Sequence, residues 1–112
     1  MIQIFGTRKC QDSKKAQRWF KERGMPFQFV DLDEKGMSPG EFRAVLKAVT
    51  AEALLDRQGK RYADRGLKHM EFDAEREMLE DQALIRTPVV RNGAKAACGG
   101  DPAAWEAVAK GS

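Results

Sequence analysis

The 112-residue chain is long enough for one folded domain and too short for two. Hydrophobic residues make up 42% of it and charged residues 33%, a balance typical of a soluble globular protein and not of a disordered or membrane-embedded one. No apolar run approaches the roughly 20 residues that a membrane span needs, and the first residues lack the apolar core of a secretory signal. We therefore expect a cytoplasmic protein without a membrane partner.

The formal net charge is +3, and seven basic residues fall between positions 1 and 24 against two acidic ones. This segment should favour anionic ligands. Direct nucleic-acid binding is not expected, because the net charge is small and no recognised nucleic-acid-binding motif is present. One histidine, His69, and two cysteines, Cys10 and Cys98, are too few for a zinc site or a disulfide framework. Any importance of the cysteines should therefore be chemical.

The first part of the chain predicts a strand, a helix and a second strand. Residues 2–5 alternate as a half-buried strand should, and the helix that follows places Ala16, Trp19 and Phe20 on one face. Residues 27–32 predict the second strand. A strand, a helix and a strand within about thirty residues indicate a βαβ unit, in which the two strands are parallel and the crossover is right-handed.

A helical insert is expected over about residues 38–83. Ser38 begins a capping box, and Thr50 and Asp73 can cap two further segments. Between them, residues 56–66 form a charged stretch for which we predict irregular structure. The side chains expected to face inward in the last segment are Met78, Leu79 and Ala83.

The last part of the chain predicts a β-hairpin and a final helix. Residues 84–85 have a strand pattern, and the hairpin turns at the Asn-Gly pair at 92–93. Pro88 cannot donate a ladder hydrogen bond, so its position near a strand start implies an edge, a bulge or a cis peptide. Asp101 is the predicted N-cap of the last helix. We expect one α/β domain over residues 1–112.

Cys10 is the strongest candidate for a reactive side chain. It lies between a strand and a helix, where free backbone N–H groups and the helix dipole stabilise a thiolate, and Arg8, Lys9 and Lys14 add positive charge. Lys14 is also a candidate for contacting an anionic ligand. Ser13, one helical turn on, is expected to donate its hydroxyl to the sulfur. The alternative is that Cys10 is a small buried apolar residue.

Two motifs carry a resemblance to a known family. They are residues 6–16, GTRKCQDSKKA, and, after an all-helical insert, residues 87–90, TPVV. On these motifs the chain resembles the thioredoxin fold, and more narrowly the branch that holds glutaredoxin-coupled arsenate reductases and Spx-type transcription regulators. The resemblance covers essentially the whole chain. It implies a thioredoxin-like α/β fold with a four-stranded mixed sheet and flanking helices.

The resemblance assigns Cys10 as the reactive cysteine. Ser13 stands where Spx-type proteins and dithiol enzymes have a second cysteine. Because a C-x-x-S site cannot close a local disulfide, the resemblance implies a monothiol mechanism in which glutathione or another thiol resolves a mixed disulfide. Glutathione is then a co-substrate, and no bound cofactor is expected.

Further positions match the family's binding residues. Thr87 and Pro88 match the dipeptide whose backbone pairs with a substrate chain in thioredoxin-like proteins. Gly99, Gly100 and Asp101 resemble the segment of glutaredoxins that holds the γ-glutamyl end of glutathione. Backbone amides at a helix N-terminus suit a carboxylate ligand, so this match has a physical basis.

The chain departs from the arsenate reductases of this branch at their oxyanion-binding arginines. Thr87 occupies the position directly before the proline, with Arg86 one residue early, and Gly99 or Gly100 stands where the last arginine is expected. Only Arg57 lies near the arginine of the insert. This pattern argues against arsenate as the substrate.

Two functions follow as hypotheses. The first is a thiol-disulfide oxidoreductase that acts through Cys10 on a protein disulfide or a small oxidised substrate, with glutathione or a glutaredoxin- or thioredoxin-type protein as its partner. The alternative is an Spx-like redox-sensing protein that contacts RNA polymerase and has no catalytic activity. Cys98 can either resolve Cys10 or pack in a strand, and its small apolar neighbours favour packing.

Overall fold

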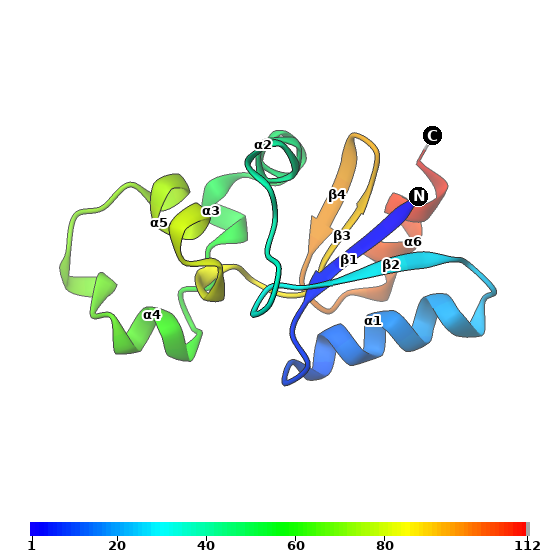
Figure 1. Ribbon diagram of the computed structural model, residues 1–112, viewed down its shortest axis with the longest axis horizontal. Helices are drawn as coiled ribbons and strands as arrows, with labels where there is room; N and C mark the ends of the chain where they lie inside the picture. Colours follow the sequence, from blue (N-terminus) through cyan, green and yellow to red (C-terminus); the bar gives the residue numbers. More distant parts are fainter. Residues whose placement is uncertain (112) are drawn as a thin grey trace.

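The computed structural model describes residues 1–111, which form a four-stranded mixed sheet with helices on both faces (Figure 1). The strands are β1 (Ile2–Gly6), β2 (Phe27–Asp31), β3 (Val89–Asn92) and β4 (Lys95–Cys98). Their order across the sheet is β2-β1-β3-β4, with β1 and β2 parallel and the other neighbours antiparallel. The expected mixed sheet, with its βαβ unit and C-terminal hairpin, is confirmed.

The helices form three groups around this sheet. They are α1 (Gln11–Glu22), α2 (Pro39–Ala48), α3 (Ala51–Leu54), α4 (Lys60–Asp64), α5 (Ala74–Glu80) and α6 (Pro102–Lys110), with short 3₁₀ turns η1 (Leu67–His69) and η2 (Gln82–Leu84). Helices α1 and α6 pack on one face, and α2 packs beside β4 on the other. Helices α3 to α5 extend beyond the end of the sheet, so the molecule is elongated, 44 × 26 × 24 Å (Figure 1). None of the helices in the described chain is long and apolar enough to cross a membrane.

The sheet separates two apolar clusters because successive strand residues point to opposite faces. Ile4 and Val90 face α1 and α6, whereas Phe5 and Val89 face α2 and the insert. On the α1 side the buried partners are Ala16, Phe20, Trp105 and Val108. On the insert side they are Val30, Leu32, Met37, Phe42, Val45, Leu54, Leu55, Tyr62, Leu67, Met78, Leu84 and Ile85.

Four helix starts follow the predicted capping chemistry. Ser38 and Glu41 form a reciprocal capping box at α2, and the side chains of Thr50, Asp73 and Asp101 accept hydrogen bonds from the first-turn N–H groups of α3, α5 and α6. These local signals are therefore confirmed.

Four expectations for the insert and its flanks are wrong. Residues 56–66, expected to be irregular, contain helix α4, which forms because Tyr62 is buried against the insert cluster. Leu84 ends a 3₁₀ turn and Ile85 makes only an isolated bridge to Leu55, so this apolar pair is buried without forming a strand. Ala83, expected to face inward, is exposed, and the second strand ends one residue early, at Asp31.

The contact between Gly6 and Ser13 sets how closely α1 approaches β1. Gly6 is the buried last residue of β1, and Ser13 is fully buried in the first turn of α1. A Cβ atom at Gly6 would lie 2.3 Å from the Ser13 Oγ and 2.7 Å from its Cβ. Only glycine allows this approach, because any side chain at position 6 would push the helix start away from the strand.

Substituting Gly6 by alanine should therefore lower the free energy of unfolding by about 1–3 kcal/mol, the usual cost of overpacking. Urea unfolding measures this. Ser13→Ala should not rescue Gly6→Ala, because the Cβ of residue 13 still clashes. Gly40→Ala is the matched control, since its Cβ would have no neighbour closer than 4.0 Å. Equal effects of the two glycine substitutions would contradict the proposed close packing.

Candidate active site at Cys10

Cys10 is the N-cap of α1 and lies at the end of the loop that leaves β1. Its backbone is extended, with φ −79° and ψ 116°, and its carbonyl accepts the first helical hydrogen bond from Lys14 N–H at 3.2 Å. The Cys10 N–H donates to the Thr7 carbonyl at 3.3 Å, which closes the loop. The side chain is half-buried. The sulfur thus lies at the positive end of a twelve-residue helix and remains accessible.

Two donors from opposite ends of the chain converge on the Cys10 sulfur. The Ser13 backbone N–H donates to Sγ at 3.4 Å, and the Thr87 hydroxyl donates to it at 3.1 Å. The thiol in turn reaches the Thr87 carbonyl at 3.8 Å. Donors directed at a sulfur favour its anionic form. The contact also shows that the residue before Pro88 lies directly against Cys10, and the Thr87–Pro88 peptide bond is cis.

The Ser13 hydroxyl does not donate a hydrogen bond to the Cys10 sulfur, so this expectation from the sequence is wrong. Its Oγ is fully buried and has no hydrogen-bond partner within the described part of the chain, so it does not donate to Cys10. The tight packing of α1 against Gly6 directs it towards the strand. Ser13 therefore contributes to the site through its backbone N–H.

Part of the positive charge that the sequence places near Cys10 is neutralised by acidic side chains. Arg8 is paired with Asp31 at 3.4 Å and Glu34 at 3.2 Å, at the end of β2. Lys9 and Lys14 are exposed and make no ion pair with residues 1–111. The positive charge available to a ligand here thus comes from these two lysines and the helix terminus.

The glycine pair before α6 lies against the first turn of α1. Gly99 donates its N–H to the Pro88 carbonyl at 2.9 Å, and its own carbonyl accepts from the Trp105 indole at 3.0 Å. A Cβ at Gly100 would lie within 2.8 Å of both carboxylate oxygens of Asp12, so residue 100 lies directly against this side chain. The fold therefore brings residues 99–100 to the same end of the sheet as Cys10.

A cleft of about 360 Å³ lies beside Cys10, between its loop and the insert. It is lined by Thr7, Lys9, Asp33, Asp56, Gly59, Lys60, Arg61, Gln82, Ala83, Ile85 and Thr87. The motifs indicated Lys9 and Thr87, but the polar residues of the insert carry no local signal that would place them here. They line the cleft only because the insert packs against the end of the sheet.

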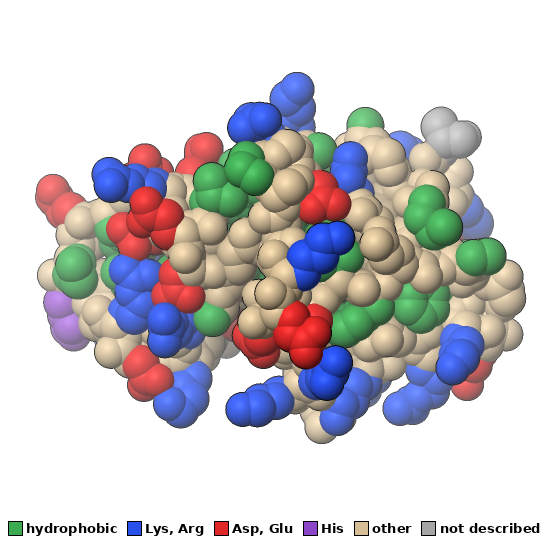
Figure 2. Space-filling model, in the orientation of Figure 1, with side chains coloured by type: hydrophobic (Ala, Val, Ile, Leu, Met, Phe, Trp, Pro, Cys, Tyr) green, Lys and Arg blue, Asp and Glu red, His purple; other side chains and the backbone are tan. Residues whose placement is uncertain are grey.

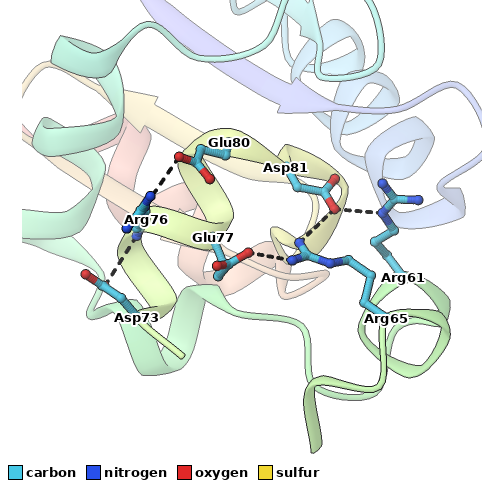
Figure 3. A network of polar contacts seen from close by, with 7 residues as sticks. All are labelled: Arg61, Arg65, Asp73, Arg76, Glu77, Glu80 and Asp81. Atoms are coloured by element: carbon cyan, nitrogen blue, oxygen red, sulfur yellow. Dashed lines mark hydrogen bonds and ion pairs between the residues drawn. The ribbon is translucent and has the colours of Figure 1, made fainter. Parts of the chain in front are cut away.

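Two of the three basic residues that line this cleft, Lys60 and Arg61, are engaged in ion pairs, and the pairs of Arg61 and its neighbour Arg65 with the α5 region are drawn in Figure 3. Arg61 pairs with Asp81 at 2.8 Å, and Arg65 bridges Asp81 and Glu77. Burial raises the pKa of Asp81, but the hydrogen bonds from Arg61 and Arg65 outweigh it and lower that pKa below its ordinary value. Lys60 is paired with Asp64 at 2.7 Å.

Arg57 does not line the cleft. Its guanidinium donates to the Tyr62 hydroxyl at 3.2 Å and lies over that ring. Its role as a ligand-binding residue stays a prediction, as do those of Lys14 and Asp101.

Cys98 has a different environment from Cys10. It ends β4 and faces the insert, where its thiol donates to the Ala53 carbonyl at 3.5 Å. Burial raises the pKa of the Cys98 thiol, and the nearby charge of Arg86 opposes this only in part. Both cysteines are free thiols. These contacts agree with the expectation that Cys98 packs in a strand.

Comparison with known proteins places the chain in a family. The sequence profile of the ArsC family matches residues 5–108, which include every motif described above. The chain belongs to the ArsC family. A comparison with curated proteins finds no match.

Solved structures related to the ArsC family share the fold. The YffB (PA3664) protein is 25% identical, with a TM-score of 0.82 over 96% of this chain and 98% of that one. An arsenate reductase-related protein from Brucella melitensis is 27% identical, with a TM-score of 0.69 over 97% and 94%. The arsenate reductase from Vibrio cholerae, 19% identical with a TM-score of 0.79 over 96% of each chain, shares the fold. The thioredoxin-like fold of this ArsC-family chain is thus confirmed.

Thr87→Val should slow alkylation of Cys10 by iodoacetamide at pH 7 about fivefold, because a hydrogen bond worth about 1 kcal/mol to the thiolate is lost. Ser13→Ala should leave the rate unchanged, since the backbone N–H remains. The rates are followed by mass spectrometry in a Cys98→Ser background. A slow Ser13→Ala variant beside a normal Thr87→Val variant would contradict the assignment of donors.

The Cys98 thiol should react only at higher pH than an ordinary cysteine, because its raised pKa keeps it protonated through the neutral range. The pH profile of iodoacetamide alkylation in a Cys10→Ser variant measures this. The same variant unfolded in urea serves as the control, and its profile should lie at lower pH. Coincident profiles for the folded and unfolded protein would refute the effect of burial.

Proposed function

We propose that this protein is a glutathione-dependent thiol-disulfide oxidoreductase that acts through Cys10 alone. The observation that carries the proposal is the convergence of the Ser13 N–H and the Thr87 hydroxyl on the Cys10 sulfur at the start of a helix. Membership of the ArsC family agrees with thiol-redox chemistry in general.

The reaction starts with a mixed disulfide between a substrate thiol and glutathione. The Cys10 thiolate attacks the glutathione sulfur, the old S–S bond breaks, and the substrate leaves as a thiolate that takes up a proton. A second glutathione then attacks the Cys10–glutathione disulfide as a thiolate. This step releases oxidised glutathione and restores Cys10, so the net reaction consumes one free glutathione and converts the mixed disulfide into the substrate thiol and oxidised glutathione.

Main-chain groups beside the sulfur support this role. The Thr87 N–H has no hydrogen-bond partner within residues 1–111, and the Thr87 carbonyl contacts only the Cys10 thiol. An extended tripeptide can therefore pair with this residue while its sulfur meets Cys10. Gly100 and Asp101 lie at the same end of the sheet, and their N–H groups, which have no partner within residues 1–111, are available to a carboxylate of the ligand.

Two observations support a single-thiol mechanism, and two argue against arsenate as the substrate. Ser13 replaces a second nearby cysteine, and the Cys98 thiol is held protonated by burial. Arg61 in the cleft is paired with Asp81, and Arg57 contacts Tyr62. An arsenate dianion would therefore meet no free arginine among the residues that line the cleft.

Incubation with oxidised glutathione should add one glutathione to the wild type and to Cys98→Ser, and none to Cys10→Ser, because only Cys10 has a reactive sulfur. Intact-protein mass spectrometry measures the addition. Turnover is then tested with glutathione and 2-hydroxyethyl disulfide, with arsenate as the comparator. Activity on the disulfide and none on arsenate is expected. A Cys10 that takes up no glutathione would overturn the proposal.

A further inference from the structure

A second cavity, of about 440 Å³, lies at the opposite end of the sheet from Cys10, between α2 and the turn of the β3–β4 hairpin. Figure 1 shows these two elements side by side at the top of the view, whereas the loop that enters α1 lies at the bottom. The cavity is lined by Gly40, Arg43, Ala44, Lys47, Arg91, Gly93 and Ala94. Its volume lies within the range of small-ligand sites.

Three of the lining residues are basic and none is acidic. Arg43 and Lys47 lie one turn apart on the same face of α2, and Arg91 reaches the cavity from β3. In contrast to Arg8, Lys60 and Arg61 near Cys10, none of the three makes an ion pair within the described residues. Lys and Arg side chains gather over α2 at the top edge of Figure 2.

Arg91 is held in place by neutral partners. Its Nε donates to the Gly93 carbonyl at 2.9 Å, and its Nη1 donates to the Gln3 amide oxygen at 2.8 Å. A guanidinium has five N–H donors, so these two bonds leave three without a protein partner in residues 1–111. A positioned guanidinium with free donors is suited to a tetrahedral or planar oxyanion.

One acidic group, Glu41, lies close enough to Arg91 to feel its charge, but its carboxylate is engaged with other partners. Its carboxylate accepts from the Ser38 N–H at 2.9 Å and from the Gln3 amide at 3.0 Å. Burial raises the pKa of Glu41, but these hydrogen bonds and the charge of Arg91 together lower it, so the group is a carboxylate at neutral pH. One carboxylate against three cations leaves the cavity with net positive charge.

The residues that line the cavity between the basic groups have small side chains or none. Gly40, Ala44, Gly93 and Ala94 leave the space open, and a Cβ at Gly93 would meet nothing within 4 Å. The cavity is larger than a single oxyanion requires, so it has room for a compact organic group attached to one. A hollow lined by small residues and three basic side chains favours a small anionic ligand over a flat acidic protein surface.

We propose that the cavity between α2 and the β3–β4 turn binds a doubly charged phosphate group, either as inorganic phosphate or as a small phosphate monoester. Arg91 and Arg43 donate to the phosphate oxygens, and Lys47 contributes a point charge. The site is separate from Cys10 and does not depend on the redox function proposed above.

The test is a titration of the ¹⁵N-labelled protein with inorganic phosphate and with phenyl phosphate, at pH 7.5 and constant ionic strength maintained with chloride. Saturable shifts are expected at the backbone amides of Gly40, Gly93 and Ala94, and the Cys10→Ser variant should show the same shifts. Tighter binding of phenyl phosphate would identify an esterified ligand, and equal binding would identify free phosphate. Both results support the site.

Arg43→Gln/Lys47→Gln should weaken phosphate binding about tenfold or more, because two charge-assisted contacts are lost. Lys15→Gln/Arg18→Gln removes the same charge from α1, which does not line the cavity, and should leave binding unchanged. Arg91→Gln tests the third cation. If that variant unfolds, the double variant at Arg43 and Lys47 still decides the test, because both side chains are exposed. Shifts centred on residues 7–13, shifts that chloride reproduces, or equal loss in both double variants would overturn the proposal.

Discussion

The packing of Ser13 against Gly6 is the contact on which the position of Cys10 depends. It presses the first turn of α1 onto the end of β1, and so directs the Ser13 N–H at the cysteine sulfur. The second donor, Thr87, lies 77 residues after Cys10 in the chain. It reaches the sulfur because β3 runs antiparallel to β1, with Phe5 opposite Val89. The environment of the thiol is thus a product of strand register and helix packing together.

The insert completes the site from the other side. Its helices attach to the sheet mainly through buried apolar side chains such as Leu54, Leu55 and Met78. The ion pairs of Arg61 and Arg65 are partly exposed, so each adds little to stability. Their larger effect is electrostatic, because Asp81 neutralises the positive charge with which Arg61 would otherwise face the cleft. The insert, which has eight basic and ten acidic residues over 38–83, therefore presents a cleft wall on which both basic residues, Lys60 and Arg61, are paired.

Local patterns in the sequence predict most of the fold. Capping residues such as Ser38 and Asp101 mark helix starts, because their hydrogen bonds involve neighbours a few residues away. Such patterns also placed Cys10 at a helix N-terminus. They could not predict the orientation of the Ser13 hydroxyl or helix α4, because both depend on packing against residues distant in the chain. For the same reason, the lining of the cleft appears only in three dimensions.

The two cysteines have the same side chain but lie in different surroundings. At Cys10, the Ser13 N–H and the Thr87 hydroxyl both donate hydrogen bonds to the sulfur. At Cys98, the sulfur donates to a carbonyl in a buried setting that raises the pKa and favours the thiol. Both cysteines are free thiols in the structure, and they lie in these different surroundings. Under the proposed single-thiol function an external thiol resolves the oxidised Cys10, and that thiol has to reach the sulfur through the cleft beside Thr87.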